Sequence, residues 1–187
     1  MIRLFIAVNC NDETKNLLLS VQDDIKSQSL KGNFSRPENL HLTLVFLGET
    51  PDDQVPAICT IIQEAMQPSI APFTLAFSQT GCFRHSDKEL WWIGAQQTDP
   101  SLIILKNLRQ RIMNGLSAAN IAYDDRPFKP HITLGREIKQ SASAMRHAPI
   151  VLRQQEITLP VNRISLMKSE RLNGVLVYTP IFGQTLG

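Results

Sequence analysis

Two segments of the sequence, 90 positions apart, repeat one arrangement of residues. The first runs from Arg36 to Leu44 and the second from Arg126 to Leu134. In each, Arg-Pro stands five residues before a histidine, and that histidine opens a His-apolar-Thr-Leu sequence. Internal similarity of this kind indicates that one supersecondary unit occurs twice in the chain.

The sequence before each segment is also alike in the two halves. A strand-like apolar run at 2–8 and helical spacing at 17–25 precede the first segment, and runs of the same two kinds at 90–95 and 102–116 precede the second. The chain has 187 residues, which suits one domain or two small lobes. We therefore expect an α+β fold, in which a single duplicated domain spanning 1–187 has two lobes, a pseudo-twofold axis and a central cleft between the motifs.

The rest of the pattern predicts further elements. A helix is expected to begin near 50–53 and to continue to 65, because Pro51 and two acids suit a first turn. Further strands are expected at 40–47, 73–77, 131–134, 150–159, 163–168 and 175–182.

Composition excludes several classes of protein. Hydrophobic residues make up 43% and charged residues 19%, which is ordinary for a globular domain and excludes wholesale disorder. No apolar run approaches the ~18 residues of a membrane span, and the run at 4–8 is too short for a signal peptide. Three cysteines without a close pair fit a reducing compartment. We expect a cytoplasmic protein without a membrane association or an obligatory protein partner, hence a monomer.

Charge is distributed unevenly along the chain. The formal net charge is +2, but Lys and Arg number 7 against 12 acids in residues 1–100, and 12 against 5 in residues 101–187. Solvated surface charge explains this on its own. A basic second half would also suit an anionic ligand such as a phosphate.

Alternation along a strand gives the two motifs a common chemistry. His41 and Thr43 share one face of their strand, and His131 and Thr133 share one face of theirs, while the apolar residues between them face a core. Two strands brought together would therefore gather two imidazoles and two hydroxyls around one centre.

Two histidines suit a concerted proton transfer. Near neutral pH one imidazole can act as the base and the other, protonated, as the acid, while hydroxyls donate to oxygens that gain charge. Phosphodiester cleavage needs this set of groups, and symmetry leaves open which histidine takes which role. A metal site is less favoured, since catalytic zinc usually has three protein ligands and neither motif places a carboxylate or thiol beside its histidine. We expect no metal and no cofactor.

The motifs resemble those of a known family. The segments 41–48 and 126–136, together with the start at 3–8 and the tail at 178–180, resemble the two-histidine phosphoesterase superfamily, and within it the RNA 2′,3′-cyclic phosphodiesterases, also called 2′-5′ RNA ligases. The resemblance implies antiparallel sheets lining the cleft and metal-independent opening of a 2′,3′-cyclic phosphate to a 2′-phosphomonoester, with 2′-5′ RNA ligation as the reverse reaction.

The resemblance also implies roles for individual residues. His41 would be the proton donor, His131 the proton acceptor, and Thr43 and Thr133 would hold the phosphate. Arg136 also matches the second motif and would bind the phosphate. Strict alternation, however, places Arg136 on the face opposite to His131, so it reaches the cleft only if the strand bends near Gly135.

Other sequence features leave alternatives open. Trp91 and Trp92 are adjacent in a strand, so at most one of them faces a cleft. Arg36 and Arg126 either line the cleft mouth or form surface ion pairs. The expected partner is an RNA end or a small cyclic-phosphate nucleotide. The alternatives are a phosphodiesterase for another cyclic phosphate, such as a cyclic nucleotide or an ADP-ribose cyclic phosphate, and a non-catalytic module that binds RNA ends.

Overall fold

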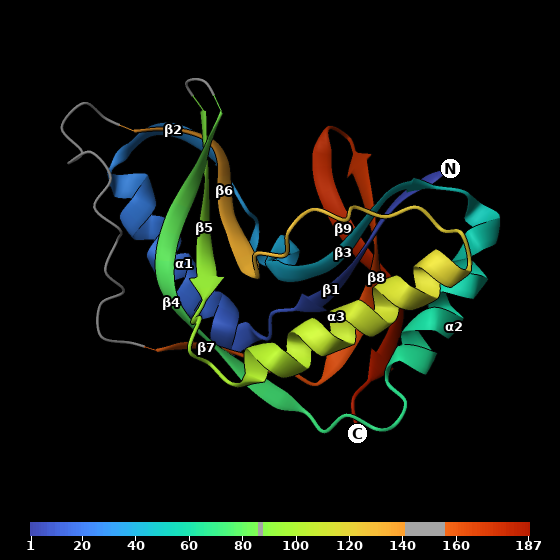
Figure 1. The fold of residues 1–187 in the computed structure, drawn as a ribbon. Coiled ribbons are helices and arrows are strands. Elements are labelled where there is room, and N and C mark those ends of the chain that lie inside the picture. The colour runs from blue at the N-terminus through green and yellow to red at the C-terminus, as the bar shows by residue number, and fades with distance from the viewer. Residues whose placement is uncertain (86–87, 141–155) are drawn as a thin grey trace.

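The computed structural model of the chain describes residues 1–85, 88–140 and 156–187 (Figure 1). The predicted strand at 150–159 lies in part outside these residues. The strands are β1 (Ile2–Asn9), β2 (Ser29–Phe34), β3 (His41–Thr50), β4 (Phe73–His85), β5 (Lys88–Ala95), β6 (His131–Gln140), β7 (Ile157–Val161), β8 (Arg163–Leu172) and β9 (Val175–Thr185). The α-helices are α1 (Asp12–Ser27), α2 (Val55–Ala65) and α3 (Ser101–Ala118), and short 3₁₀ turns lie at Pro37–Asn39 and Asp52–Gln54.

The nine strands form one antiparallel sheet whose two halves meet at the motif strands. The order is β7-β4-β5-β6-β3-β1-β8-β9, and β2 adds to the free edge of β6. β3 and β6 are joined by a single residue pair, Leu42 with Ile132, after which the two strands separate. The next strand beyond β6 is β5, which precedes α3, and the next strand beyond β3 is β1, which precedes α1. This order suits the predicted duplication, which itself stays a prediction.

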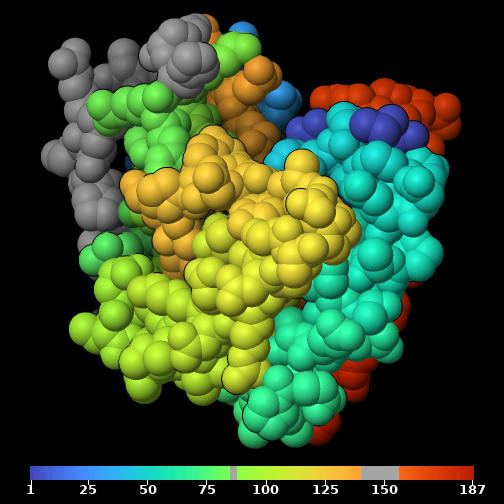
Figure 2. All heavy atoms as spheres, turned by 45° about the vertical axis from the view of Figure 1, so that its right-hand side comes forward, coloured from blue at the N-terminus to red at the C-terminus, as the bar shows by residue number. Residues whose placement is uncertain are grey.

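The two long helices, α1 and α3, each pack against the other half of the sheet. α1, which follows β1, packs against β2, β6 and β7, so it covers the half of the sheet that carries the second motif. α3, which follows β5, packs against α2 and also contacts β3 and β4 (Figure 1). In the space-filling view the side chains of α3 lie directly against those of α2 (Figure 2). Each motif strand is therefore backed by the helix that precedes the other motif.

Apolar side chains at helical spacing explain these packing faces. In α3 the buried residues are Leu102, Leu105, Leu108, Ile112 and Leu116, the series that predicted this helix. At the start of α1 the Asn11 side chain accepts a hydrogen bond from the backbone N–H of Thr14 at 3.0 Å, which caps the helix. Among the described residues no helix combines the length and the apolar character needed to span a membrane.

Candidate active site

Each motif strand carries a β-bulge at the same motif position. Along β1 and β3, Ile6 pairs with Val45 but Ala7 pairs with Thr43, so Leu44 is an extra residue. Along β5 and β6, Trp91 pairs with Gly135 but Trp92 pairs with Thr133, so Leu134 is extra. The fourth residue of each His-apolar-Thr-Leu motif is therefore the bulged one.

The bulges change which side chains face the histidines. Leu134 and Gly135 are both buried, and Arg136 returns to the side of Thr133 and lines a cavity together with His41. Strict alternation would place Arg136 on the opposite face, and the bulge supplies the bend near Gly135 that the sequence analysis gave as the condition for Arg136 to reach the histidines, because one extra residue shifts the period by one. In β3 the same shift brings Phe46 to the cavity lining. Arg136 and Phe46 thus occupy corresponding positions of the two motifs.

Polar side chains from helices α1 and α3 hold the bulge carbonyls. Gln22 of α1, only 1% exposed, donates from Nε2 to the carbonyl of Leu134 at 2.7 Å and to that of Ser35 at 2.8 Å. The Leu134 carbonyl also accepts from the backbone N–H of Ser35 at 2.9 Å. In the other half, Nε of Arg109 on α3 donates to the carbonyl of Leu44 at 3.0 Å. The bulges are therefore fixed parts of the fold.

The junction between β3 and β6 brings the four motif side chains together. An antiparallel register through Leu42 and Ile132 sets His41 opposite Thr133 and Thr43 opposite His131. His131 is close enough to His41 to contribute to the lowering of its pKa, so the two imidazoles belong to one site.

Both imidazoles are oriented in the same way by the backbone. Nδ1 of His41 donates to the carbonyl of Asn39 at 2.7 Å, and Nδ1 of His131 donates to the carbonyl of Lys129 at 2.6 Å. A carbonyl only accepts, so Nδ1 carries the hydrogen in each neutral ring and Nε2 keeps its lone pair. Nε2 of His41 lies 3.0 Å from Oγ1 of Thr43, whose hydroxyl donates to it in this state.

Burial makes both histidines weaker bases than free imidazole. It is the main reason that the pKa of His41 falls to about 4; the hydrogen bond to Asn39 opposes the fall, while the positive charge of Arg136 and proximity to His131 add to it. Burial, followed by Arg136, likewise holds the pKa of His131 below its ordinary value, against the hydrogen bond to Lys129. Near pH 7 both rings are therefore neutral in the free protein.

Aromatic rings flank each imidazole. Around His41 the ring centroid of Phe5 lies at 4.8 Å and that of Tyr178 at 5.1 Å. Around His131 the centroid of Phe83 lies at 5.6 Å and that of Trp92 at 6.1 Å. These four rings come from β1, β9, β4 and β5. The spacing of residues around the motifs therefore did not predict them, except that one of the two adjacent tryptophans was expected to be able to face a cleft.

Asn39 links the first motif to β9. Its Nδ2 donates to the carbonyl of Leu176 at 2.9 Å, and its Oδ1 accepts from the backbone N–H of Tyr178 at 3.2 Å. One residue therefore orients the His41 ring through its backbone and places the Tyr178 ring through its side chain.

A cavity of about 750 Å³ opens from His41 toward the β8–β9 hairpin. Its charged lining consists of Arg3, Arg136, Lys168, Arg171, Glu49 and Glu170. Arg3 pairs with Glu49 at 3.2 Å and Lys168 with Glu170 at 2.9 Å, whereas Arg136 has no carboxylate partner in the described ranges. The lining includes Thr43 but neither His131 nor Thr133, which lie toward Phe83 and Trp92.

The structure also places the two tryptophans and the two motif arginines whose positions the sequence left open. Trp91 is 3% exposed and donates from its indole N–H to Glu89 at 2.9 Å, so Trp92 is the tryptophan on the histidine side. Arg126 forms an ion pair with Asp124, and Arg36 lies 3.6 Å from Glu38, which makes both surface ion pairs. Within the part of the chain that the structure describes, no three His, Cys, Asp or Glu side chains cluster closely enough to hold a metal ion.

Comparison with known proteins gives consistent matches. A model of the 2′-5′ RNA ligase superfamily matches residues 19–173. The RNA 2′,3′-cyclic phosphodiesterase of Thermus thermophilus is 31% identical over 180 residues, which cover 95% of this chain and 86% of the relative. The Escherichia coli protein of the same name is 28% identical over 144 residues, 75% of each chain.

Solved structures resemble the whole fold. TT0787 of Thermus thermophilus has a TM-score of 0.75 and 30% identity, and the match covers 99% of this chain and 98% of that one. Escherichia coli LigT complexed with 3′-AMP has a TM-score of 0.74 and 25% identity with the same coverage.

Proposed function

The chain belongs to the 2′-5′ RNA ligase superfamily, and on this premise we propose that it hydrolyses RNA ends carrying a 2′,3′-cyclic phosphate to 2′-phosphomonoesters. The observation that carries the proposal is the pair of matched imidazoles, His41 and His131. Each fixes Nδ1 on a backbone carbonyl two residues upstream and keeps Nε2 as the reactive atom. Relatives named RNA 2′,3′-cyclic phosphodiesterase match most of this chain, which supports the same reaction.

The proposed step is an in-line displacement at phosphorus. Nε2 of His131 accepts a proton from the attacking water, and Nε2 of His41 donates a proton to the departing 3′ oxygen. The P–O3′ bond breaks as the bond from water to phosphorus forms, so the phosphate remains on the 2′ oxygen. With a 5′-hydroxyl in place of water, the same step gives a 2′-5′ phosphodiester.

Three side chains are proposed to hold the phosphate oxygens. The hydroxyls of Thr43 and Thr133 lie on the same strand faces as the histidines and can donate to oxygens that gain charge in the transition state. The guanidinium of Arg136 can donate two hydrogen bonds to one phosphate. Its place in the cavity lining, and the influence of its charge on both imidazoles, support this role.

Substrate binding is proposed to favour the protonated form of His41, the proton donor. His41 is neutral near pH 7 in the free protein, because burial holds its pKa at about 4. A cyclic phosphate monoanion beside the ring favours the imidazolium and raises that pKa. The proton donor therefore forms together with the enzyme–substrate complex.

Phosphorus NMR tests the proposal directly. A short RNA ending in a 2′,3′-cyclic phosphate is incubated with the protein in excess EDTA, beside His41→Ala and His131→Ala. A 2′-phosphomonoester signal that appears with the wild-type protein and with neither variant is the expected result. The surface variant Arg36→Met serves as the matched control and is expected to be active. An unchanged cyclic signal, or turnover that survives the loss of either histidine, contradicts the proposal.

A further inference from the structure

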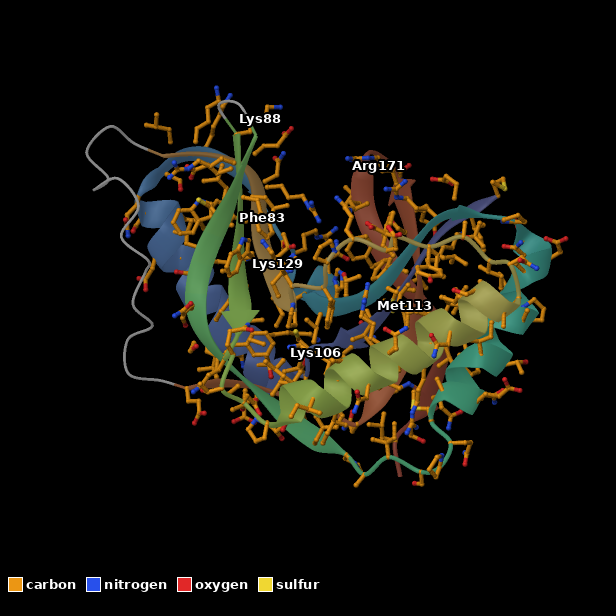
Figure 3. All side chains as sticks on the ribbon, viewed as in Figure 1. Phe83, Lys88, Lys106, Met113, Lys129 and Arg171 are labelled. Carbon is orange, nitrogen blue, oxygen red and sulfur yellow. The ribbon has the colours of Figure 1, made fainter. Side chains whose placement is uncertain are left out.

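A half-exposed aromatic surface lies beside His131, on the side that the cavity does not reach. Phe83 is 37% exposed, and its ring centroid lies 5.3 Å from that of Trp92 and 5.6 Å from that of His131. Phe83 projects from β4 near the segment that precedes β6, where Lys129 lies (Figure 3). We call Phe83, Trp92 and Lys129 the aromatic platform.

Strand register places the platform on the face of the catalytic side chains. Trp92 pairs with Thr133 across β5 and β6, and paired residues share a face, so Trp92 lies on the side of His131. Gly81 pairs with Trp92 across β4 and β5, and Phe83 is two residues further along β4, on the same face. The platform therefore adjoins the reaction centre.

Two glycines allow the Trp92 ring to lie against the sheet. A Cβ at Gly94 would lie 2.8 Å from the ring, and one at Gly81 would overlap it. The indole N–H is buried and has no hydrogen-bond partner among the described residues. The Trp92 ring therefore lies flat against the backbone at these two glycines, and its indole N–H adds no hydrogen bond to hold it there.

Lys129 adds a positive charge at the rim of the platform. Its Nζ lies 5.7 Å from the centre of the Phe83 ring, and within the described residues it has no carboxylate partner. An exposed cation–π contact contributes about 0.5–1 kcal/mol, less than the about 1–3 kcal/mol of a stacked base, so a nucleobase can displace the lysine from the Phe83 ring. Its ammonium then remains beside the base, where it can pair with a phosphodiester.

We infer that the aromatic platform binds the nucleobase of a second RNA strand, whose 5′-hydroxyl attacks the cyclic phosphate in place of water. The inference rests on the proposed function, because it takes His131 as the proton acceptor. The nucleophile enters beside His131, and a water molecule needs no aromatic surface to bind there. A nucleoside is held by such a surface, since stacking on exposed rings is a common way for proteins to bind an unpaired base.

The ligation step balances without a further reactant. The 5′ oxygen bonds to phosphorus while its proton passes to His131. The P–O3′ bond breaks, and O3′ takes a proton from His41. The product is a 2′-5′ phosphodiester with a free 3′-hydroxyl, and no water is consumed or released.

The test measures how the cyclic phosphate is partitioned between water and an alcohol. An RNA with a 2′,3′-cyclic phosphate end is mixed with increasing amounts of a 5′-hydroxyl dinucleotide, and the ratio of 2′-5′-linked product to 2′-phosphomonoester is followed. This ratio cancels any loss of activity that both reactions share through His131. We expect Phe83→Ala and Trp92→Leu to raise the acceptor concentration for half-maximal ligation about tenfold, as the loss of one stacking surface predicts.

Two comparisons separate a stacking surface from a structural role. Trp92→Phe keeps an aromatic face and removes the unpaired N–H, so it is expected to retain the wild-type ratio. Ile103→Ala, at a 65% exposed position of α3, is the matched control and leaves both reactions unchanged. If Trp92→Leu does not fold, Phe83→Ala and Lys129→Met at exposed positions carry the test.

The outcomes that overturn the inference differ from those that overturn the proposed function. A wild-type protein that hydrolyses the end but forms no acceptor-dependent product overturns the inference. So does a partition ratio that Phe83→Ala and Trp92→Leu leave unchanged, or variants that raise only the KM for the cyclic end, which would assign the platform to the donor strand. Absence of hydrolysis by the wild-type protein contradicts the proposed function instead.

Discussion

Replacement of Gln22 tests whether the bulge in β6 positions Arg136. Gln22→Met keeps the volume and the unbranched shape of this buried side chain but removes both hydrogen bonds from its Nε2. The Leu134 carbonyl keeps the bond from the backbone N–H of Ser35, whereas the Ser35 carbonyl loses the partner that the structure gives it. An unsatisfied carbonyl costs about 1–3 kcal/mol when it is fully buried, and for the part-buried Ser35 carbonyl we expect about 1–2 kcal/mol. At about 2–4 °C per kcal/mol for a chain of this size, Tm falls by roughly 2–8 °C.

The functional effect is read from a double-mutant cycle. We expect Gln22→Met to loosen the turn at Leu134 and Gly135 that brings Arg136 to the histidines. Removing the guanidinium by Arg136→Met then lowers kcat/KM less in the Gln22→Met background than in the wild-type one. A coupling of about 1 kcal/mol corresponds to roughly a fivefold difference in kcat/KM.

The assay is hydrolysis of the cyclic-phosphate end, measured well below the Tm of each variant. Gln110→Met, at an exposed position of α3, is the matched control, since its side chain bonds only to Asn114 in the described structure. Effects of Gln22→Met and Arg136→Met that simply add would refute the reasoning, because the buried amide would then stabilise the fold without positioning the arginine.

Four further predictions concern the pH dependence, the stability and the thiol reactivity of the protein. The proposed step needs one imidazole protonated and the other neutral, and burial lowers the pKa of both His41 and His131. We therefore expect kcat/KM to be maximal below about pH 6.5 and to fall toward pH 8. Arg136→Met removes a charge that lowers both pKa values, so the rate profile moves to higher pH. Asn39→Ala removes two hydrogen bonds to β9 and lowers Tm by roughly 2–8 °C in a thermal melt. Burial raises the pKa of the Cys10 thiol to about 12, so mass spectrometry should find it alkylated last of the cysteines.

Local patterns in the sequence predicted the motif strands, the long helices and the shared face of each His-Thr pair. These features depend on periodicity within one element, and Leu102 to Leu116, for example, are buried as the helical spacing requires. β2 was not predicted, because its alternation is weak and it pairs with the edge of a strand about 100 residues away. Pairing between distant segments leaves no local signal.

The side of the sheet on which Arg136 lies could not be predicted from local sequence patterns alone. Its side of the sheet depends on one extra residue in β6, and the carbonyl of that residue is held by Gln22 from a helix more than 100 positions earlier. The sequence pointed to a bend near Gly135 as the condition for Arg136 to reach the histidines, but it contained no sign that Gln22 was involved. A buried polar side chain in an otherwise apolar helix face is the one signal that could have suggested such a contact.

The two bulged strands also explain how a symmetric pair of motifs can act asymmetrically. At corresponding positions after the bulges, β3 presents the apolar ring of Phe46 and β6 presents the guanidinium of Arg136. The charge of Arg136 lowers the pKa of both histidines, yet deeper burial makes the larger difference at His41. A bound phosphate anion favours the imidazolium form of both rings, and burial opposes that form more strongly at His41. The unequal burial, together with Phe46 in one strand and Arg136 in the other, gives the two imidazoles different surroundings, so the proposed roles of His41 as proton donor and His131 as proton acceptor are not interchangeable.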